Sequence, residues 1–289
     1  WRDEFISGNI DICSREMKHM RCHMCGKNNE MLKYVDFENL KKPKILKLTA
    51  NFNGQCNLQC QMCHIWKMPN GLYDEINFWS YAKENLFPHI VEIDMLSGEP
   101  LIQQDTYRLI NEVSEINPEC RWSITTNAHW KLGQKITSHL DKIKLKQLMV
   151  SIDSLDEKTY YKIRYPGKLK LVLGTVDDII QYNHSRDERG LGKFDIYLNF
   201  LAQKDNWREI PKLLKYTESK GIIPHIIYLY EPEEFSLDTL SLTEKQEVID
   251  FLLSNVPKAM HYLIQRVLYP LIGPMPIIDK KANFLKMLD

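Results

Sequence analysis

Three cysteines lie within eight residues of the sequence, and their spacing constrains the chain more than any other feature. Cys56, Cys60 and Cys63 are separated by three and then by two residues. A structural zinc site closes with four protein ligands, whereas an iron–sulfur cluster held by three thiolates keeps one iron open for a small molecule. His64 is a conceivable fourth ligand, but adjacent side chains rarely reach one tetrahedral ion together. Three unrelated buried thiols are the remaining alternative.

The pattern of strands and helices around these cysteines predicts an α/β fold. Ile45–Phe52 alternates as a strand and leads directly into the cysteine loop. Further strands are expected at Ile90–Leu96, Trp122–Thr126, Leu148–Asp153, Phe194–Phe200 and Ile222–Tyr230. Helices are expected near Phe78–Phe87, Asp105–Ile116, Asp156–Arg164, Val172–Tyr182 and Trp207–Lys220. Such alternation implies a parallel sheet with right-handed crossovers. Six strands suit a partial (β/α)6 TIM-like barrel, and an open doubly wound sheet is the alternative.

Small polar motifs lie at the carboxyl ends of the second and fourth expected strands, where a parallel α/β fold places its chemistry. Gly98 permits a backbone turn, and the Glu99 carboxylate can accept a hydrogen bond from an ammonium group. Ser151 and Asp153 point to one face of their strand, because side chains alternate along it. Simpler interpretations also stand: Glu99 as a solvent-exposed loop carboxylate, and Asp153 as the cap of the helix that starts near Glu157.

Further polar residues stand at or near strand ends. Thr126 and Asn127 close the third strand, either lining a pocket or forming an ordinary strand terminus. Asn199 lies in an otherwise apolar strand and must find a partner if it is buried. Arg164 is either a bidentate partner of a carboxylate or a solvated arginine at a helix end.

The sixth strand and the start of the third carry weaker candidates. His225, Tyr228 and Tyr230 either flank a ligand or belong to the core. Cys120 lies away from the other cysteines, and we expect it to be a small buried thiol without a chemical role.

Taken in order, the cysteine spacing and these motifs resemble the radical S-adenosylmethionine (radical SAM) superfamily over residues 45–235. The resemblance implies that Cys56, Cys60 and Cys63 hold a [4Fe-4S] cluster whose open iron chelates S-adenosylmethionine. It also implies reductive cleavage of this cofactor to a 5′-deoxyadenosyl radical, which removes a hydrogen atom from a substrate.

The resemblance further assigns the residues around the cofactor. The expected contacts are Met62, Ser97, Gly98, Glu99, Thr126, Asn127, Ser151, Asp153 and Arg164. Asn199 is added as a cofactor or substrate contact because it is a polar residue in an apolar strand. Glu99 belongs to the motif that binds the amino group of S-adenosylmethionine, and Ser151 and Asp153 to the motif that contacts the ribose. Arg164 fits the position that pairs with the cofactor carboxylate.

The chain departs from the family pattern at three of these places. Met62 stands near the adenine, where the family usually has an aromatic residue. Ser97 replaces the first glycine of the Gly-Gly-Glu-Pro motif, and Ala128 replaces the glycine that usually follows Thr-Asn.

A second group of cysteines lies near the start of the sequence. Cys22 and Cys25 form a Cys-x2-Cys pair followed by glycine, the usual form of a metal knuckle, and Cys13 lies nearby. The segment resembles the auxiliary-cluster extensions of the twitch and SPASM groups of radical SAM enzymes. Three thiols are too few for a fully ligated cluster, so we expect a fourth ligand upstream of Trp1 or an open iron. Zinc would accept His23 as its fourth ligand equally well.

Three regions follow from these assignments. Residues 1–43 form an N-terminal Cys-rich extension, residues 44–235 the radical SAM core, and residues 236–289 a helical C-terminal segment. The boundary is the polar break Lys41–Lys44. A zinc-ribbon-type binding module on an α/β scaffold is the rival, and a radical enzyme that binds a cluster but turns nothing over is a third candidate. Iron content and absorption near ~400 nm separate iron from colourless zinc.

Composition and charge indicate which partners to expect. Lys plus Arg equals Asp plus Glu at 38 each, so no global field attracts nucleic acid. No apolar run approaches the ~20 residues of a membrane span, and clustered cysteines fit a reducing compartment, so we expect a cytoplasmic protein. The resemblance implies an electron donor such as flavodoxin or ferredoxin. The substrate is not identified, and a peptide is one candidate because such extensions often accompany peptide chemistry in related enzymes.

Overall fold

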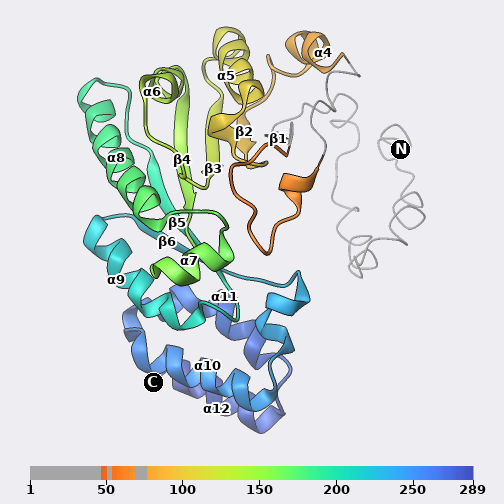
Figure 1. Ribbon diagram of the computed structural model, residues 1–289, viewed down its shortest axis with the longest axis vertical. Coiled ribbons are helices and arrows are strands. Elements are labelled where there is room, and N and C mark those ends of the chain that lie inside the picture. Colours follow the sequence, from red (N-terminus) through yellow and green to blue (C-terminus); the bar gives the residue numbers. More distant parts are fainter. Residues whose placement is uncertain (1–46, 51–53, 69–76, 289) are drawn as a thin grey trace, which may run out of the picture. The chain divides into compact units, whose positions relative to one another are not determined.

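The computed structural model describes residues 47–50, 54–68 and 77–288 (Figure 1). The chain divides after Ile45, and all described residues belong to the unit Leu46–Asp289. The expected auxiliary site at Cys13, Cys22 and Cys25 therefore lies outside the described residues.

Six parallel strands form one sheet in which every strand pairs with the next one in the sequence. They are β1 (Lys47–Ala50), β2 (Glu92–Met95), β3 (Arg121–Thr126), β4 (Lys144–Ser151), β5 (Asp195–Ala202) and β6 (Ile223–Tyr228). A doubly wound sheet reverses its strand order at a switch point, and this order contains no reversal. Right-handed crossovers of a sequential order put all connecting helices on one face, as Figure 1 shows for α5, α6 and α8. The predicted partial (β/α)6 barrel is confirmed.

Helices connect the strands and complete the C-terminal part. The connecting helices are α4 (Phe78–Asn85), α5 (Gln104–Ile116), α6 (Gln134–Leu140), α7 (Glu157–Ile163), α8 (Leu169–Glu188) and α9 (Ile210–Lys220). Short 3-10 turns occur at Ile65–Lys67, Pro100–Ile102, Trp207–Glu209, Glu233–Phe235, Leu237–Thr239 and Lys258–Met260. The predicted helical C-terminal segment is confirmed as α10 (Leu242–Asn255), α11 (His261–Ile272) and α12 (Ile277–Leu288). Among the described helices, none has the length and apolar character needed to cross a membrane.

Local sequence explains where several of these helices begin and end. Asp156 caps α7, because its carboxylate accepts from the backbone N–H groups of Lys158 and Thr159. Ser241 and Glu244 form a capping box at the start of α10.

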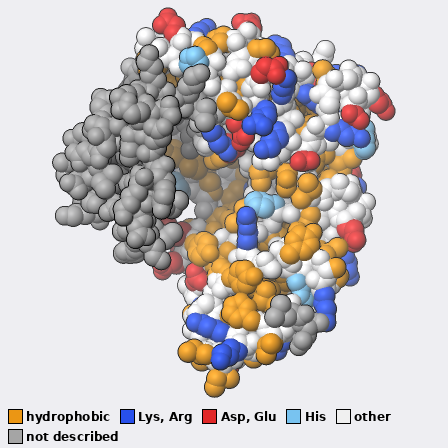
Figure 2. All heavy atoms as spheres, turned by 180° about the vertical axis from the view of Figure 1, so that it is seen from behind, with side chains coloured by type: hydrophobic (Ala, Val, Ile, Leu, Met, Phe, Trp, Pro, Cys, Tyr) orange, Lys and Arg blue, Asp and Glu red, His pale blue; other side chains and the backbone are white. Residues whose placement is uncertain are grey.

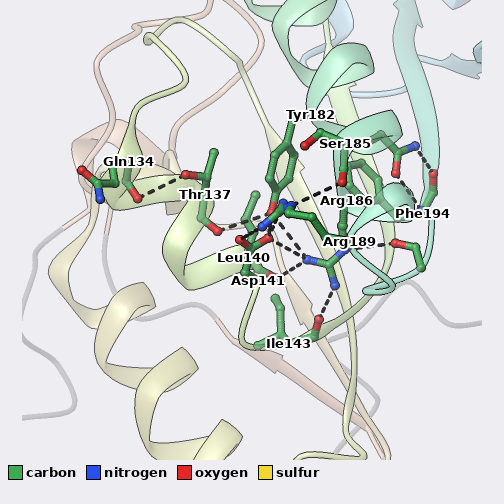
Figure 3. Close-up of polar contacts among 12 residues, drawn as sticks. Gln134, Thr137, Leu140, Asp141, Ile143, Tyr182, Ser185, Arg186, Arg189 and Phe194 are labelled. Atoms are coloured by element: carbon green, nitrogen blue, oxygen red, sulfur yellow. Dashed lines mark hydrogen bonds and ion pairs between the residues drawn. The ribbon is translucent and has the colours of Figure 1, made fainter.

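Helix α6 was not expected from the sequence. Only Ile136 and Leu140 of this helix are buried, so its apolar periodicity is sparse. Its C-terminal end is held by a side chain from α8, since the buried Arg186 donates to the carbonyl oxygens of Leu140 at 2.6 Å and Ile143 at 2.7 Å (Figure 3). Such a cap satisfies carbonyl groups that have no partner within the helix.

Strand alternation divides the sheet residues between the core and the site. Along β5, the side chains of Ile196, Leu198 and Phe200 are buried in the hydrophobic core. The intervening Asn199 and Leu201 line a cavity on the other face of the strand. The carboxyl ends of the parallel strands therefore carry the residues that face this cavity.

Candidate active site

A cavity of about 380 Å³ opens at the carboxyl ends of the strands. Predicted site residues that line it are Cys56, Cys60, Met62, Cys63, Gly98, Thr126, Asn127, Ser151, Asp153, Arg164 and Asn199. Lining residues that the sequence did not single out are Leu58, Ile65, Trp66, Leu96, Thr125, Leu201 and Ile227. The volume lies within the range of small-molecule and cofactor sites, and Figure 2 shows hydrophobic side chains gathered around a hollow in the described surface.

The cysteine loop is fixed by backbone contacts on both sides. A Cβ atom on Gly54 would lie 2.2 Å from the carbonyl oxygen of Ile65, so only glycine fits where the two ends of the loop meet. Further along the loop, Gln59 N–H donates to the carbonyl of Tyr165 at 2.5 Å, and Gln61 N–H donates to the carbonyl of Ile163 at 2.9 Å. The loop is thereby attached to the end of α7.

The three thiols face one cavity, and two of them, Cys56 and Cys60, lie near hydrogen-bond donors. Asn127 Nδ2 lies 3.6 Å from Cys56 Sγ, and Arg164 Nη1 lies 3.8 Å from Cys60 Sγ. Burial raises the pKa of Cys60 to about 11, although the Arg164 charge acts in the opposite direction. No three His, Cys, Asp or Glu side chains of the described residues are placed to hold a single metal ion. Three thiols around one cavity, with polar donors directed at sulfur, have the donor chemistry of an iron–sulfur cluster site.

The turn after β2 packs directly against the start of the cysteine loop. Gly98 has a φ of 57°, and a Cβ atom there would lie 2.4 Å from the carbonyl oxygen of Gln55. The same carbonyl accepts from Glu99 N–H at 2.9 Å and from Gln103 Nε2 at 3.0 Å. The glycine is therefore required both for its left-handed backbone and for this close approach.

Glu99 is fully buried, so its interpretation as a solvent-exposed loop carboxylate is wrong. Its oxygens accept from Thr126 Oγ1 at 2.7 Å, from Asn127 N–H at 2.6 Å and from Trp130 Nε1 at 3.2 Å. Burial raises the pKa of Glu99, whereas these hydrogen bonds lower it. Neither Glu99 nor Ser97 is among the residues that line the cavity. Their assignment to the cofactor stays a prediction, and the observed role of Glu99 is to join the ends of β2 and β3.

Asp153 and Arg164 form a buried ion pair at the cavity wall. Asp153 Oδ2 accepts from Arg164 Nε at 2.8 Å and Nη2 at 2.6 Å, while its Oδ1 accepts from Leu201 N–H at 2.7 Å. The side chains are 1% and 9% exposed, so the interpretation of Arg164 as a solvated arginine is wrong. Asp153 does not cap α7, because Asp156 does. Both groups line the cavity, so each can also reach a ligand there.

Asn199 is oriented by a chain of two further side chains. Its Oδ1 lies 3.1 Å from His225 Nδ1, and His225 Nε2 lies 2.9 Å from Arg266 Nη1. A guanidinium only donates, so His225 Nε2 is the acceptor and the proton of the neutral ring is on Nδ1. His225 Nδ1 therefore donates to Asn199 Oδ1, which leaves the Asn199 amide N–H groups available to the cavity. Burial lowers the pKa of His225, and the charge of Arg266 lowers it further.

The remaining candidates lie outside the cavity. Tyr228 is buried and donates to Asp238 Oδ1 at 2.7 Å, which fits the core interpretation. Tyr230 is 59% exposed and lies beyond the end of β6. The expectation for Cys120 as a small buried thiol is confirmed by its 1% exposure.

The chain matches a known protein family and has curated relatives. The Radical SAM superfamily model matches residues 50–217, more than half of the chain. The GTP 3′,8-cyclase of Sulfurimonas denitrificans is 25% identical over 211 residues, which cover 71% of this chain and 62% of that protein. The probable GTP 3′,8-cyclase of Methanocaldococcus jannaschii is 26% identical over 189 residues, covering 64% of this chain and 59% of that protein. The chain thus spans about 60% of these relatives.

Solved structures show the same fold at lower identity. Streptococcus suis SuiB bound to its precursor peptide SuiA has a TM-score of 0.52 and 18% identity, covering 92% of this chain and 59% of that one. The enzyme anSMEcpe, with bound AdoMet and the Cp18Cys peptide, has a TM-score of 0.51 and 15% identity, covering 78% of this chain and 66% of that one. The chain belongs to the radical SAM superfamily.

Proposed function

We propose that Cys56, Cys60 and Cys63 hold the [4Fe-4S] cluster and that S-adenosylmethionine binds beside it in the 380 Å³ cavity. The observation that supports this assignment is convergence: the three thiols line one cavity together with polar residues from the ends of β3, β4 and β5. When bound, this pair of cofactors supplies a 5′-deoxyadenosyl radical that abstracts a hydrogen atom from the substrate.

The residues of the chain bind and orient the cofactor. Arg164 is placed to bind an anionic group of S-adenosylmethionine while Asp153 holds its guanidinium in position. Asn199 donates to an acceptor on the cofactor or the substrate, and Ser151 offers a hydroxyl from the neighbouring strand. Met62 contributes apolar surface for the adenine, in place of the usual aromatic residue.

A peptide is the substrate class that we propose. Arg164 is the one Lys or Arg among the described residues that line the cavity, and it is already paired with Asp153. A nucleoside triphosphate needs several cationic or metal contacts, so this lining favours a less charged substrate. The curated relatives are named GTP 3′,8-cyclases, which makes GTP the comparison to test. We expect calorimetry to detect no binding of GTP at millimolar concentration. A Kd for GTP in the micromolar range would contradict the peptide assignment.

The cluster assignment is tested by replacing its three thiols. Anaerobic reconstitution of Cys56→Ala/Cys60→Ala/Cys63→Ala should lose the iron, the sulfide and the visible absorption of this cluster, together with reductive formation of 5′-deoxyadenosine. The matched control is Cys120→Ala, which removes a buried thiol outside the cavity and should leave all these quantities unchanged. Full retention of iron, sulfide and absorption in the triple variant would refute the assignment.

A further inference from the structure

Two exposed tyrosines form a small apolar surface at the end of α7. The side chains of Tyr161 and Tyr165 are 48% and 47% exposed, and their rings meet edge to face with centroids 5.3 Å apart. Exposed aromatic residues are enriched in protein–protein interfaces, where they supply contact area at low entropic cost.

This tyrosine pair lies directly behind the cysteine loop. The carbonyl oxygen of Tyr165 accepts from Gln59 N–H at 2.5 Å, and Gln59 precedes Cys60 in the sequence. The next contact, from Gln61 N–H to the carbonyl of Ile163, brackets Cys60 on its other side. One backbone hydrogen bond therefore separates the surface residue Tyr165 from the loop that carries the thiols.

Three lysines line a groove that is formed in part by the residues following Tyr165. Lys131, Lys168 and Lys170 line a groove of about 550 Å³, and Asp178 is the one acidic residue in its lining. None of the three lysines forms an ion pair with any residue that the structure describes. The chain as a whole has a formal net charge of zero, so this groove is a local positive region.

A second hydrogen-bonded connection joins this groove to the cysteine loop. Lys168 N–H donates to His129 Nε2 at 3.0 Å, and the carbonyl of His129 accepts from Asn57 Nδ2 at 2.7 Å. Asn57 follows Cys56 directly. Lys168 is thus connected to the Cys56 end of the loop through His129, and Tyr165 contacts the loop next to Cys60. We call Lys131, Lys168, Lys170, Tyr161 and Tyr165 together the Lys–Tyr surface.

We propose that the Lys–Tyr surface docks an acidic one-electron donor protein of the flavodoxin or ferredoxin type. This inference rests on the proposed function, which requires an electron to reach the cluster at Cys56, Cys60 and Cys63. One electron leaves the donor, which is oxidised by one electron, and the cluster is reduced from the 2+ to the 1+ state without transfer of an atom. Unpaired lysines complement an acidic partner and accelerate its encounter, and the tyrosines supply the apolar centre of the contact.

The first test measures binding of oxidised flavodoxin to the reconstituted enzyme by calorimetry at low ionic strength. The variant Lys131→Glu/Lys168→Glu/Lys170→Glu should raise the Kd at least ~10-fold, because three attractive charges become repulsive. The control Lys215→Glu/Lys258→Glu/Lys281→Glu changes the net charge equally at three exposed lysines elsewhere and should leave the Kd within ~2-fold. Equal weakening by both variants would overturn the proposal.

The second test separates docking from chemistry. With dithionite as the electron source, the Lys131→Glu/Lys168→Glu/Lys170→Glu enzyme should form 5′-deoxyadenosine at the wild-type rate, whereas with reduced flavodoxin it should be at least ~10-fold slower. A loss of the dithionite-driven reaction would instead place the cofactor or substrate at this surface and contradict the inference. The Cys56→Ala/Cys60→Ala/Cys63→Ala variant should still bind oxidised flavodoxin. If that variant keeps its cluster, the proposed function fails while the docking measurement remains a valid test of the surface.

Discussion

Two charged side chains at the cavity, Asp153 and Arg164, hold each other in position without a ligand. Asp153 has a φ of 56°, a backbone conformation that costs a non-glycine residue about 1–2 kcal/mol. Its carboxylate offsets this cost by binding Arg164 and a backbone N–H of β5. The guanidinium, in turn, reaches the Cys60 thiol. The positions of the Arg164 guanidinium and of the Cys60 thiol are therefore coupled through one buried ion pair.

The first prediction at this scale concerns Arg164. Arg164→Ala leaves the Asp153 carboxylate buried without its partner, so we expect the free energy of unfolding to fall by about 3–5 kcal/mol. Loss of a charge-assisted contact should also weaken S-adenosylmethionine binding by about one to two orders of magnitude. Urea unfolding and calorimetry measure the two effects. The control Lys162→Ala removes an exposed ion pair with Asp205 and should cost at most ~1 kcal/mol. Unchanged cofactor affinity would remove Arg164 from the binding site.

The second residue-scale prediction concerns the orientation of Asn199. Arg266→Met removes the donor to His225 Nε2, so the imidazole proton is no longer confined to Nδ1 and the pKa of His225 should rise. The Asn199 amide then loses its fixed orientation, and ligand affinity should fall up to ~10-fold, the value of about one hydrogen bond. Nitrogen-15 NMR of the His225 ring reports the tautomer directly. Arg266→Lys keeps a donor to His225 and should restore the Nδ1–H tautomer. An Nε2–H tautomer in the wild type would contradict this network.

The residue types of the site could be predicted from the sequence, but their partners could not. Cys56, Cys60 and Cys63 are recognisable by spacing alone, and Gly98 by its turn. The burial of Glu99 depends on Trp130, which is 31 residues away in the sequence. No pattern in the local sequence indicates that these two residues meet. Leu201 could have been predicted as a cavity residue, because it lies two residues from Asn199 and so shares its face of β5.

Elements far from the cavity are joined by a partly buried polar cluster between α6 and α8 (Figure 3). Asp141 follows α6, and its carboxylate accepts from Tyr182 Oη at 2.6 Å and from Arg189 Nη1 at 2.6 Å. The side chain of Arg186 is 2% exposed and lies 3.4 Å from the same carboxylate. A buried guanidinium is costly without a nearby anion, so Asp141 stabilises the contact between the two helices.

A pH-dependent prediction follows for Asp141. Its burial raises the pKa, but hydrogen bonds from Arg189 and Tyr182 outweigh this effect and the net shift is downward. The stability contributed by this shift is therefore complete above the unfolded value of 3.8 and is lost as the pH falls through the lowered folded pKa. Asp141→Asn should cost about 1–3 kcal/mol at pH 7, and this difference should shrink as the pH falls below that unfolded value.

Urea unfolding from pH 7 to pH 3 measures this difference. The control is Asp187→Asn on α8, the helix that carries Arg186, because Asp187 pairs with Lys193 where both side chains are about half exposed. That variant should change the free energy of unfolding by less than ~1 kcal/mol. A difference for Asp141→Asn that stays constant down to pH 3 would contradict the assignment of the stabilisation to its charge.

Element boundaries were predictable where hydrophobic periodicity is strong. Strand β4 was expected from Leu148 but begins at Lys144, because Lys144 and Lys146 are exposed and alternate with buried Leu145. A search for runs of apolar residues misses this strand end, because charged residues interrupt the run. Helix α6 was missed for the related reason that its C-terminal end is stabilised by Arg186, 46 residues beyond Leu140.

At the scale of the whole molecule, a sequential parallel sheet explains why residues distant in sequence form one site. Each crossover returns the chain to the same edge, so the strand ends contribute residues to one cavity, and the polar ones come from β3, β4 and β5. The described residues contain one such site, around Cys56, Cys60 and Cys63. The segment 1–43, outside them, carries Cys13, Cys22 and Cys25, and we propose that these hold a second iron–sulfur cluster. A second redox centre in a radical enzyme can accept an electron from a substrate radical or anchor the substrate.

The last prediction tests this second centre. After anaerobic reconstitution, the Cys56→Ala/Cys60→Ala/Cys63→Ala variant should still contain iron and sulfide and show an iron–sulfur signal by EPR or Mössbauer spectroscopy. Adding Cys22→Ala and Cys25→Ala should remove that signal, because the Cys-x2-Cys pair supplies two of its thiolates. Zinc is the competing metal, since His23 or another residue can complete a four-ligand site. Stoichiometric zinc with no residual iron in the triple variant would assign the segment to a structural zinc site.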